Sequence, residues 1–503
     1  MKAFFFLIFL SIFSCPVAAQ SQSADSGSIS AIISEKGLNF VKDLLIEQEL
    51  RALVPLKLKD VEKSIRIPLI GSVYVSLANI TVLEVSVSSS TVHPGDTGVV
   101  IVASGATANL SMDWRYSYRT WLTPVEISDK GSALVQVEGM QVGLTISMKT
   151  RNGTLQLTVL ECGCSMKDLS ITLEGGASWF YQGFVIAFED QIRSAMESAI
   201  TKKITEGTSK LDLFLRSLPK EINVDNNVAL NVTFMNDPIL GDSSVEFDIN
   251  GLFIPSDKVA LPRNSYESSQ TSISCLGAPR MLGISLDETV FTSAAAVYFQ
   301  AGSMHWLVDK VPDQSLLNTA SWKFIIPQLY WKYPNDDMEL NITLISPPVM
   351  RIKPEGIGAT ITAEMTANVL HKSESIPVAC IMVVVSVSGV VEISGNNLAG
   401  KAELNDFTLS LKWSKVGNFH MYLIQGVMKV FLNTVFIPLV NSHLKQGFPL
   451  PIIHGFTLQD AEILTSSSKI VVCSDVVFTN SNSLMRFLLQ NYSSMLRLRN
   501  QWK

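Results

Sequence analysis

The stretch that decides the fold is LANITVLEVSVSSSTVHPGDTGVVIVASGATANL, residues 77–110, because the chain contains a version of it twice. The second version, LNITLISPPVMRIKPEGIGATITAEMTANVL, occupies residues 340–370. The matching landmarks lie 262, 260 and 259 residues apart: Asn79-Ile80-Thr81 with Asn341-Ile342-Thr343, Pro94 with Pro354, and Ala108-Asn109 with Ala367-Asn368. Because the offset is nearly constant, the match predicts two copies of one structural module.

Hydropathy around both copies alternates with a period of two residues. The alternation covers residues 56–160 and again residues 322–411, and turn signals such as His93-Pro94-Gly95-Asp96 interrupt it. This pattern predicts long antiparallel strands. Residues 376–394 are the most apolar run after the first twenty residues, but serines and a glycine break it. It falls short of the ~20 apolar residues that a membrane-spanning helix needs, so we expect a strand.

Each set of strands is flanked by apolar residues at helical spacing. Residues 29–54 predict a helix ended by Pro55, residues 178–204 a helix closed by Gly207, and residues 211–222 a short helical piece. Residues 287–302 begin a helix in the second copy, and residues 419–448 predict a long amphipathic helix kinked at Pro438. A helix that lies along a curled sheet can enclose an elongated apolar slot.

The composition suits a large secreted chain. It is 47% hydrophobic and 17% charged, with a mean hydropathy of +0.27. Lys2, the apolar run 3–13 and the small residues Val17-Ala18-Ala19 predict a secretory signal peptide over residues 1–19. A β-rich core and an internal lipid cavity would both explain the high apolar fraction. Six glycosylation sequons fit a secreted surface, at Asn79, Asn109, Asn152, Asn231, Asn341 and Asn491.

The mature chain of about 480 residues is long enough for two domains. We expect the first at residues 20–255, a polar linker at 256–272, and the second at 273–480. Residues 481–503 carry four cations and no acid, which predicts a basic amphipathic tail. The tail could lie at a membrane interface, cover a pocket, or pack on its own barrel.

The chain lacks the known signatures of catalysis. The six histidines form no HExxH, and no GxSxG, GxxxxGK[ST] or GxGxxG occurs. The net charge of −6 argues against general nucleic-acid binding. We therefore expect no enzyme, no metal and no nucleic-acid partner.

Cys162-Gly-Cys164 is the only close pair of cysteines. The two could bond each other through a strained ring, or one could reach Cys275, Cys380 or Cys473. The pairing stays open, and with five cysteines after the signal peptide at least one thiol has no intramolecular partner.

Four stretches together resemble a known family. They are GLNFVKDLL, CGCSMKDLSITLEGGASWFYQGF, VNSHLKQGFPLPIIHGFTLQD and KIVVCSDVVF. The chain resembles the family of bactericidal/permeability-increasing and lipopolysaccharide-binding proteins (BPI/LBP) from about residue 29 to 478, and CGC and GGASW look like its plant branch. The resemblance implies an α+β fold: an elongated boomerang of two pseudo-symmetric barrels, each a strongly twisted antiparallel sheet with long amphipathic helices, joined by a central sheet.

In this family each barrel holds an apolar pocket that takes phospholipid acyl chains. Carried over, the resemblance implies a first pocket lined by Phe40, Val41, Leu44, Leu45, Trp179, Phe180, Phe184 and Phe188. It implies a second lined by Phe291, Val297, Tyr298, Leu423, Val427, Phe431 and Val435. Ordinary packing between helix and sheet is the alternative, because a pocket wall and a core look alike in sequence. No cofactor is expected other than bound phospholipid.

The family's defence members contact lipid A phosphates at the tip of the first barrel. The matching hairpin is MDWRYSYRTWL, residues 112–122. The resemblance implies a headgroup site at Trp114, Arg115, Arg119 and Trp121, with a second basic cluster that includes Lys57 and Lys59. Guanidinium groups bind phosphate bidentately, while tryptophan favours a lipid interface. A solvated hairpin with incidental charges is the alternative.

Charge along the chain departs from the bactericidal relatives. Residues 20–250 hold 19 Lys and Arg against 27 Asp and Glu, whereas those relatives are basic in this half. In the animal relatives the second cysteine of the motif pairs with one on the following helix, where this chain has Thr201. Killing by membrane charge and the family disulfide are both in doubt.

The leading hypothesis is a secreted, monomeric glycoprotein of plant innate immunity and defence, in the apoplast or at the cell surface. It would bind lipopolysaccharide through lipid A, and phospholipid through its acyl chains, with a membrane surface as a further partner. A general phospholipid or sterol carrier is the alternative. A protein–protein signalling module with structural lipids is the third.

Overall fold

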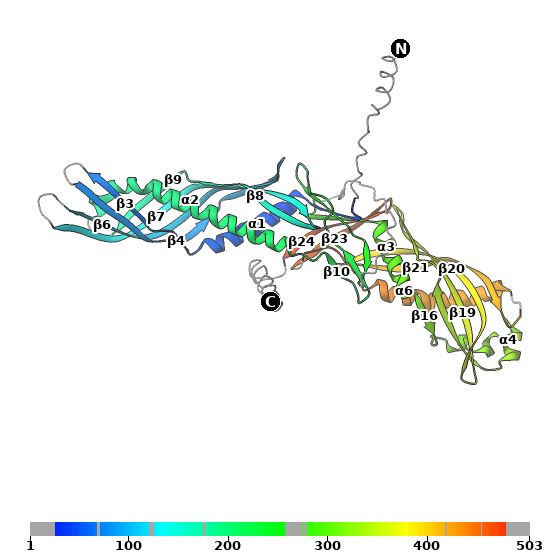
Figure 1. Ribbon diagram of the computed structural model, residues 1–503. Helices are drawn as coiled ribbons and strands as arrows, with labels where there is room; N and C mark the ends of the chain where they lie inside the picture. The colour runs from blue at the N-terminus through cyan, green and yellow to red at the C-terminus, as the bar shows by residue number, and fades with distance from the viewer. Residues whose placement is uncertain are drawn as a thin grey trace, which may run out of the picture.

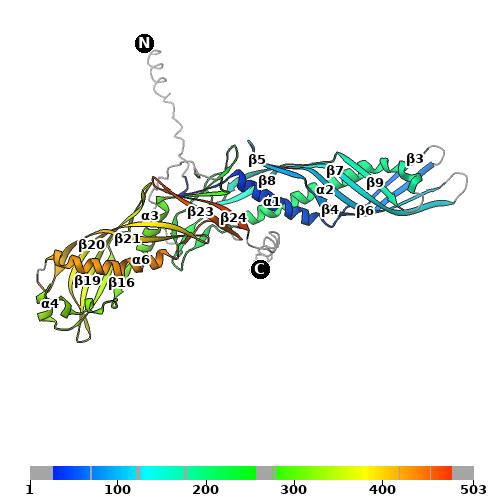
Figure 2. The ribbon, with the colours of Figure 1, turned by 180° about the vertical axis from the view of Figure 1, so that it is seen from behind.

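The computed structural model describes residues 26–67, 71–119, 125–174, 178–256, 275, 279–417, 420–453 and 455–478. They form an elongated, bent molecule with a barrel at each end and a sheet between them (Figure 1). Each barrel is a twisted antiparallel sheet with a long helix along it (Figure 2). The predicted α+β boomerang is therefore confirmed. The predicted signal peptide, most of the linker and the basic tail lie outside the described residues.

The first barrel is an eight-stranded sheet. Its main order is β2-β4-β6-β7-β8, with β3 on β4, β5 on β6 and β9 on β7. The strands are β2 (Leu56–Lys57), β3 (Val61–Ile67), β4 (Gly71–Ser86), β5 (Ser89–Pro94), β6 (Val99–Arg119), β7 (Glu126–Arg151), β8 (Thr154–Ser165) and β9 (Asp168–Glu174). Side chains alternate between the inside and the outside of the barrel along β6 and β7, as the period of two predicts.

The second barrel repeats this plan with seven strands. Its order is β16-β17-β19-β20-β21-β22, with β18 on β19. The strands are β16 (His305–Val308), β17 (Asp337–Leu344), β18 (Val349–Lys353), β19 (Gly356–His371), β20 (Glu374–Ser394), β21 (Asn397–Ser414) and β22 (Phe448–Pro449). The long apolar run is thus a central strand, β20, hydrogen-bonded on both sides.

The sheet between the barrels takes strands from distant parts of the chain. Its order is β12-β13-β1-β15-β24-β23. Its strands are β1 (Ile29–Ile33), β12 (Ile239–Leu240), β13 (Val245–Ile249), β15 (Leu282–Asp287), β23 (Phe456–Ser466) and β24 (Lys469–Phe478). A small sheet, β10 (Glu221–Asn223), β11 (Val228–Asn231) and β14 (Phe253–Pro255), packs beside it.

The internal repeat holds in strand order but not in register. β6 pairs with both β4 and β5, and β19 pairs with both β17 and β18. However, Asn109 lies opposite Glu84, which follows Asn79, whereas Asn368 lies opposite Glu339, which precedes Asn341. Bulges in β4 and β6 shift the pairing of the first copy.

The predicted first helix divides into two elements. Residues 29–33 form strand β1, and Ser34 caps helix α1 (Glu35–Leu53) by accepting a hydrogen bond from the Gly37 N–H. The prediction was wrong for the first residues because tertiary pairing decides them. β1 is hydrogen-bonded to β13 on one side and β15 on the other.

Helix α2 runs unbroken over Ser178–Arg216, so Gly207 is not the helix end that its sequence predicts. A Cβ atom on Gly207 would collide with the carboxylate of Glu49 on α1. Gly207 is therefore a close-contact position between two helices, and tertiary packing replaces its usual role as a helix terminator. The short helical piece expected after it is the last part of α2.

The last long helix changes its hydrogen-bond pattern just before Pro438, while the kink expected there stays a prediction. α5 (Met421–Phe431) continues through η3 (Leu432–Phe436), a π-helical turn, into α6 (Ile437–Leu444). At this turn the Ile437 N–H donates to the Leu432 carbonyl, five residues back, just before the proline that lacks an N–H. By length and composition this 24-residue stretch could cross a membrane, yet a core helix passes the same test. Its Ile424, Met428 and Phe431 are buried in the second barrel.

The strands predicted to start at residue 322 begin later. Short helical elements come first, η1 (Gln314–Leu317), η2 (Thr319–Trp322) and α4 (Pro327–Lys332). They lie at the far end of the second barrel, where α5 also starts (Figures 1 and 2). Helix α3 (Glu288–Gln300), capped by Asp287, confirms the expected second-copy helix.

Candidate functional site

The second barrel holds an apolar cavity near its far end. Seventeen side chains line it, all of them nonpolar or aromatic: Leu316, Leu317, Trp322, Ile326, Leu329, Met338, Leu340, Met365, Ala367, Val378, Ala379, Ile381, Val416, Ile424, Val427, Met428 and Phe431. The cavity volume is about 70 Å³, counted as the space that the centre of a water-sized sphere can occupy. The cavity is partly open. Because the lining gives water few hydrogen bonds, the space suits an apolar ligand.

The residues expected to line the second pocket separate into two groups. Val427 and Phe431 line the cavity, and Val435 packs against the same core without lining it. Leu423 lies on the outer side of α5 and is 39% exposed. α5 thus presents only one of its faces to the cavity.

The α3 residues of that expectation lie elsewhere, in the apolar cluster between the barrels. The ring of Phe291 packs edge-on against Phe448 with centroids 5.7 Å apart, and Val297 is buried. The Tyr298 hydroxyl donates to Asp225 at 2.7 Å. The structure does not bring these three residues to the cavity, because α3 starts directly after β15 of the central sheet.

Helix α2 fills the interior of the first barrel. Phe188, Ile192, Met196 and Ile200 are each 5% exposed or less and pack against inward side chains of the strands. The side chains of Trp179, Phe180 and Phe184 lie outside the described part of the structure. Phe188 therefore sits where the sequence placed it, and the contact of this face with lipid stays a prediction.

The α1 residues expected in the first pocket lie toward the central sheet. The Phe40 ring lies 6.5 Å from the Phe456 ring of β23 in the central sheet, Val41 is 38% exposed, and Leu44 and Leu45 are half-buried. The reason is positional: α1 starts directly after β1, so its first turns lie over the central sheet.

The hairpin of β6 and β7 separates its aromatic and cationic residues onto two faces. Trp114 is 4% exposed and its Nε1–H donates to the Ser132 carbonyl at 2.9 Å. Trp114, Tyr116 and Tyr118 stack in sequence along the inside of the barrel, with centroids 6.2 and 6.3 Å apart. Their spacing of two residues puts them on one face of the strand. Trp114 is therefore a core residue, contrary to its expected place at a headgroup surface.

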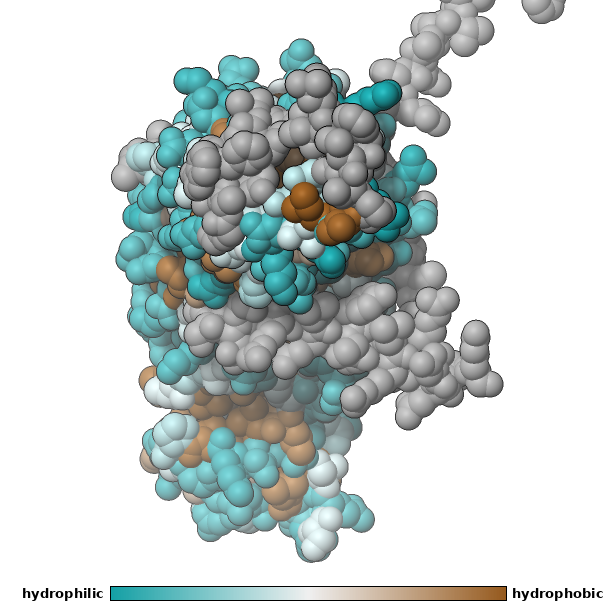
Figure 3. All heavy atoms as spheres, turned by 90° about the vertical axis from the view of Figure 1, so that its left-hand side faces the viewer, coloured by the Kyte–Doolittle hydropathy of each residue, from teal (hydrophilic) through white to brown (hydrophobic). Residues whose placement is uncertain are grey.

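Arg115 and Arg119 point outward from the same strand. Arg115 lies opposite Lys130 on β7, and Arg119 is 76% exposed with Glu126 at 3.5 Å. The end view in Figure 3 shows mostly hydrophilic surface around this tip, with a small hydrophobic patch. Trp121 lies outside the described residues. Both arginine side chains are exposed, and their contact with phosphate stays a prediction.

Lys57 and Lys59 are exposed but distant from these arginines. Lys57 of β2 lies opposite Thr81 of β4, whereas Arg115 lies opposite Ser76 and Tyr118, next to Arg119, lies opposite Val73. At the rise of an extended strand these separations are roughly 16 Å and roughly 26 Å. The structure does not bring the two basic clusters together.

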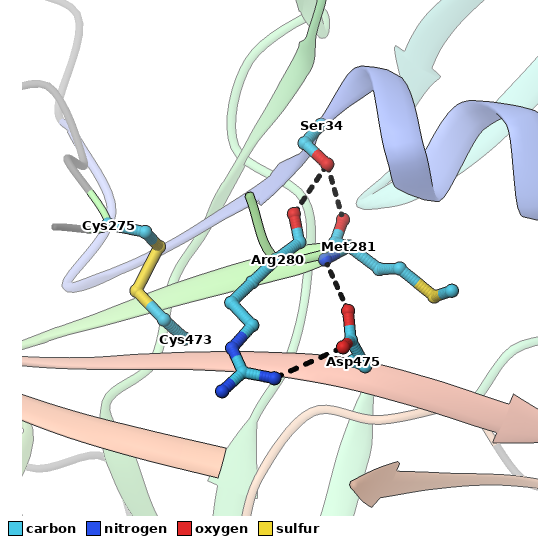
Figure 4. Close-up of a disulfide and its surroundings, with 6 residues drawn as sticks. All are labelled: Ser34, Cys275, Arg280, Met281, Cys473 and Asp475. Carbon is cyan, nitrogen blue, oxygen red and sulfur yellow. Dashed lines mark hydrogen bonds and ion pairs between the residues drawn. A yellow bond between two sulfur atoms is a disulfide. The ribbon is translucent and has the colours of Figure 1, made fainter. Parts of the chain in front are cut away.

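The disulfide joins Cys275 to Cys473 of β24, with their Cα atoms 5.9 Å apart (Figure 4). Both cysteines were among those for which the sequence left the disulfide pairing open. Next to it, Asp475 accepts hydrogen bonds from the Arg280 guanidinium and the Met281 N–H, and Ser34 donates to the Arg280 carbonyl at 2.6 Å (Figure 4). The disulfide and these hydrogen bonds connect the segment directly before β15 to β24, the last strand.

Cys162, Cys164 and Cys380 are free thiols. Cys162 and Cys164 lie two residues apart on one face of β8 and are not bonded to each other. Burial raises the pKa of the Cys162 thiol, against a hydrogen bond with Thr205, and burial raises the pKa of Cys164 to about 12. Both stay protonated near neutral pH and are poor nucleophiles. Among the described residues, no three His, Cys, Asp or Glu side chains gather as a metal site.

The sequons differ in accessibility. Asn79, Asn109 and Asn152 are exposed, while Asn231 and Asn341 are half-buried. Asn491 lies outside the described residues, and the use of each sequon stays a prediction.

Sequence reasoning missed the cavity residues that precede β17. Trp322, Ile326 and Leu329 come from η2 and α4 and the segment between them, where strands were expected. The available signal was the stretch SWKFIIPQLYWKYP, whose two prolines and clustered aromatics do not alternate as a strand does.

Fold and cavity together define a lipid-binding class of protein, and comparison with known proteins identifies the family. The model of the LBP / BPI / CETP family N-terminal domain matches residues 37–218, and its C-terminal domain model matches residues 222–478. The chain belongs to this family of lipid-binding and transfer proteins, which are not enzymes.

Individual relatives support the same family assignment. A BPI/LBP family protein of Arabidopsis thaliana is 52% identical, covering 97% of this chain and 99% of its own length. Bactericidal permeability-increasing protein of Sebastes schlegelii is 27% identical over 89% of this chain and 94% of itself. The crystal structure of lipopolysaccharide binding protein superimposes with a TM-score of 0.60 at 20% identity, over 90% of this chain and 100% of its own, and supports the fold.

Proposed function

We propose that this protein is a secreted lipid-binding protein of plant defence that takes lipid acyl chains into apolar pockets and recognises the lipid A part of lipopolysaccharide. The observation that carries the proposal is the cavity in the second barrel, lined by seventeen apolar side chains. Relatives named bactericidal permeability-increasing protein, lipopolysaccharide-binding protein and phospholipid transfer protein support it.

Apolar contact supplies the affinity in this proposal. Each buried methylene contributes about 0.8 kcal/mol, so six methylenes contribute about 5 kcal/mol before ordering costs. The cavity accommodates part of an acyl chain, and its open side lets the remainder continue outward. Met338, Met365 and Met428 in the lining are flexible enough to adjust to chain shape.

Headgroup recognition falls to Arg115 and Arg119 at the tip of the first barrel. Both point away from the barrel, so a phosphate can approach without disturbing the core. Glu126 lies 3.5 Å from Arg119, and this half of the chain carries a net negative charge. That charge favours the second candidate, a general carrier of phospholipid without an immune ligand.

The test is a lipid A titration combined with mass spectrometry of lipids extracted from the purified protein. Arg115→Ala with Arg119→Ala should weaken lipid A binding and spare the binding of uncharged lipids, which carry no phosphate. Lys149→Ala with Arg151→Ala is the matched control, because both residues are exposed cations at the opposite end of strand β7.

Three outcomes divide the candidates. Loss of lipid A binding in the arginine variant alone supports the proposal. Equal loss of lipid A and uncharged lipid binding contradicts the headgroup role, and phospholipid binding without lipid A binding favours the carrier. Absence of any extracted or bindable lipid would remove both lipid functions and favour the protein–protein module.

A further inference from the structure

The far end of the second barrel carries the two most exposed large apolar side chains of the described residues. Phe324 is 85% exposed and Trp331 is 77% exposed. Tyr422, at the start of α5, is 67% exposed, and Gly417, five residues before it, lies against Gln328 of α4. Aromatic side chains that gather at one end of a molecule mark an interaction surface more often than scattered ones do.

Lysines are interleaved with these aromatics. Residues 319–335 contain five aromatic side chains and two lysines, and no acid. Lys323 Nζ lies 4.9 Å from the ring centroid of Phe324 and 6.0 Å from that of Tyr330. Lys332 Nζ lies 5.4 Å from the centroid of Tyr333. We name Lys323, Phe324, Tyr330, Trp331 and Lys332 the aromatic–lysine cap.

The cap is free to meet an anionic partner. No ion pair involves Lys323 or Lys332 within the described part of the chain. The carboxylates that flank the segment hydrogen-bond to nearby side chains: Asp313 accepts from Ser315, Asp336 contacts His371 at 2.6 Å, and Asp337 accepts from Asn318. These bonds do not remove the carboxylate charges, but the cap residues themselves include two lysines and no acid, so the cap is positive.

The inner side of the same segment lines the cavity. Ile326 and Leu329 are buried and face the cavity, whereas Phe324 and Trp331 are exposed. Gln328 of α4 lies against Gly417, just after Val416, another lining residue. One short helix thus separates the apolar cavity from the cap.

We propose that the aromatic–lysine cap is a docking surface for an anionic phospholipid bilayer. Tryptophan and tyrosine favour the boundary between lipid headgroups and acyl chains, and lysines near the surface are attracted by anionic lipids. Exposed Phe324 supplies an apolar anchor of the kind that enters the interface. The docking proposal rests on the proposed function in one respect, namely that the molecule entering the cavity is a lipid. Docking through the cap would place the cavity beside the membrane.

Vesicle co-sedimentation of the full-length protein tests the proposal, using vesicles of phosphatidylcholine with and without 30% phosphatidylglycerol. Phe324→Ser with Trp331→Ser should lower the partition coefficient at least about tenfold on anionic vesicles. Lys323→Ala with Lys332→Ala should lower it roughly tenfold on anionic vesicles and little on neutral ones. Ile239→Ser with Val390→Ser is the control, since both are exposed apolar residues, 56% and 66%, away from the cap.

Quenching by brominated phospholipid locates the contact independently of affinity. Wild-type fluorescence should be quenched more than that of Trp331→Phe, because only the former has an indole in the cap. Equal quenching, an equal loss in the control pair, or no vesicle binding by the wild type would each overturn the docking proposal.

Lipid extracted from the Phe324→Ser, Trp331→Ser variant separates this proposal from the proposed function. Retained lipid with lost docking supports both. If the variant retains lipid and still binds vesicles as the wild type does, the docking proposal is wrong and the proposed function stands. If the wild-type protein carries no lipid, the proposed function is wrong, and the vesicle experiment still decides the docking proposal by itself.

Discussion

Asp475→Asn tests the contact group beside the disulfide, because it removes a charge and keeps the side-chain shape. The Asp475 carboxylate accepts hydrogen bonds from Lys36 Nζ at 2.9 Å, Arg280 Nη1 at 3.1 Å and the Met281 N–H at 3.2 Å. Its side chain is only 17% exposed. Three elements of the central region, α1, the start of β15 and β24, therefore meet at one carboxylate.

The expected magnitude follows from these contacts. A hydrogen bond to a charged group contributes roughly 1.5–3 kcal/mol. Lys36 is 45% exposed, so solvent screens its share strongly. Asparagine keeps one acceptor oxygen for Met281. We expect the free energy of unfolding to fall by about 2 kcal/mol at pH 7, which corresponds to a Tm about 4 °C lower for a unit of this size.

The effect should depend on pH in a definite direction. Partial burial alone would raise the pKa of Asp475, but the hydrogen bonds from Lys36, Arg280 and Met281 outweigh it and hold the pKa below its usual range. The unfolded chain then binds the proton at higher pH than the folded one. The stabilisation is present above about pH 4 and is lost as pH falls through the folded-state pKa.

Thermal unfolding of wild type and Asp475→Asn between pH 7 and pH 3 is the assay. The difference in Tm should stay constant down to about pH 5 and shrink below pH 4. Glu403→Gln is the matched control, because its ion pair with Lys401 is more than 60% exposed on both sides and should change stability by less than about 0.5 kcal/mol. A Tm difference that is the same at pH 3 and pH 7 would refute the reasoning.

Three further predictions concern the described residues. Cys473→Ser opens a disulfide that spans 198 residues and should cost up to about 5 kcal/mol, seen as a lower Tm that reductant no longer changes. Gly207→Ala should stabilise the protein less than Gly426→Ala, because its Cβ atom makes the flexible Glu49 carboxylate move aside, whereas Gly426 has open space around it. We expect up to about 1 kcal/mol of stabilisation for Gly426→Ala and at most about half of that for Gly207→Ala, and equal effects in chemical denaturation would contradict the helix contact. Cys164 should react with iodoacetamide slowly at pH 8 and faster only toward its pKa of about 12, and rapid labelling of the folded protein would contradict its burial.

Local patterns in the sequence were sufficient for the strands, the repeat and the family. Alternation along β6, β7 and β20 reports a sheet with one face inside a barrel, because side chains change face at every residue. Pro438 marked the place where the hydrogen-bond pattern of the last long helix changes, because a missing N–H acts within one helix turn. These features depend on neighbours in the chain, which the sequence contains.

The candidate site was predictable only in part. Val427 and Phe431, which the family resemblance implied, line the cavity, and Phe188 lies on the apolar face of α2 that its spacing indicated. Helical spacing could not show that α3 packs at the central sheet, because the position of α3 depends on where β15, the strand directly before it, lies in that sheet. In the hairpin, by contrast, the period of two already places Trp114, Tyr116 and Tyr118 on the face opposite to Arg115 and Arg119, and the expectation of one shared headgroup site overlooked this.

By itself, the sequence determined a repeated barrel of strands with long helices, membership in a lipid-binding family, and the absence of known catalytic signatures. Only the tertiary structure decided the strand register, the unbroken helix through Gly207, the Cys275–Cys473 disulfide and the cavity beneath α4. The physical reason is the same in each case. Glu49 and Gly207, or Leu329 and Phe431, are far apart along the chain, and their contact exists only after the sheets have curled and brought them together.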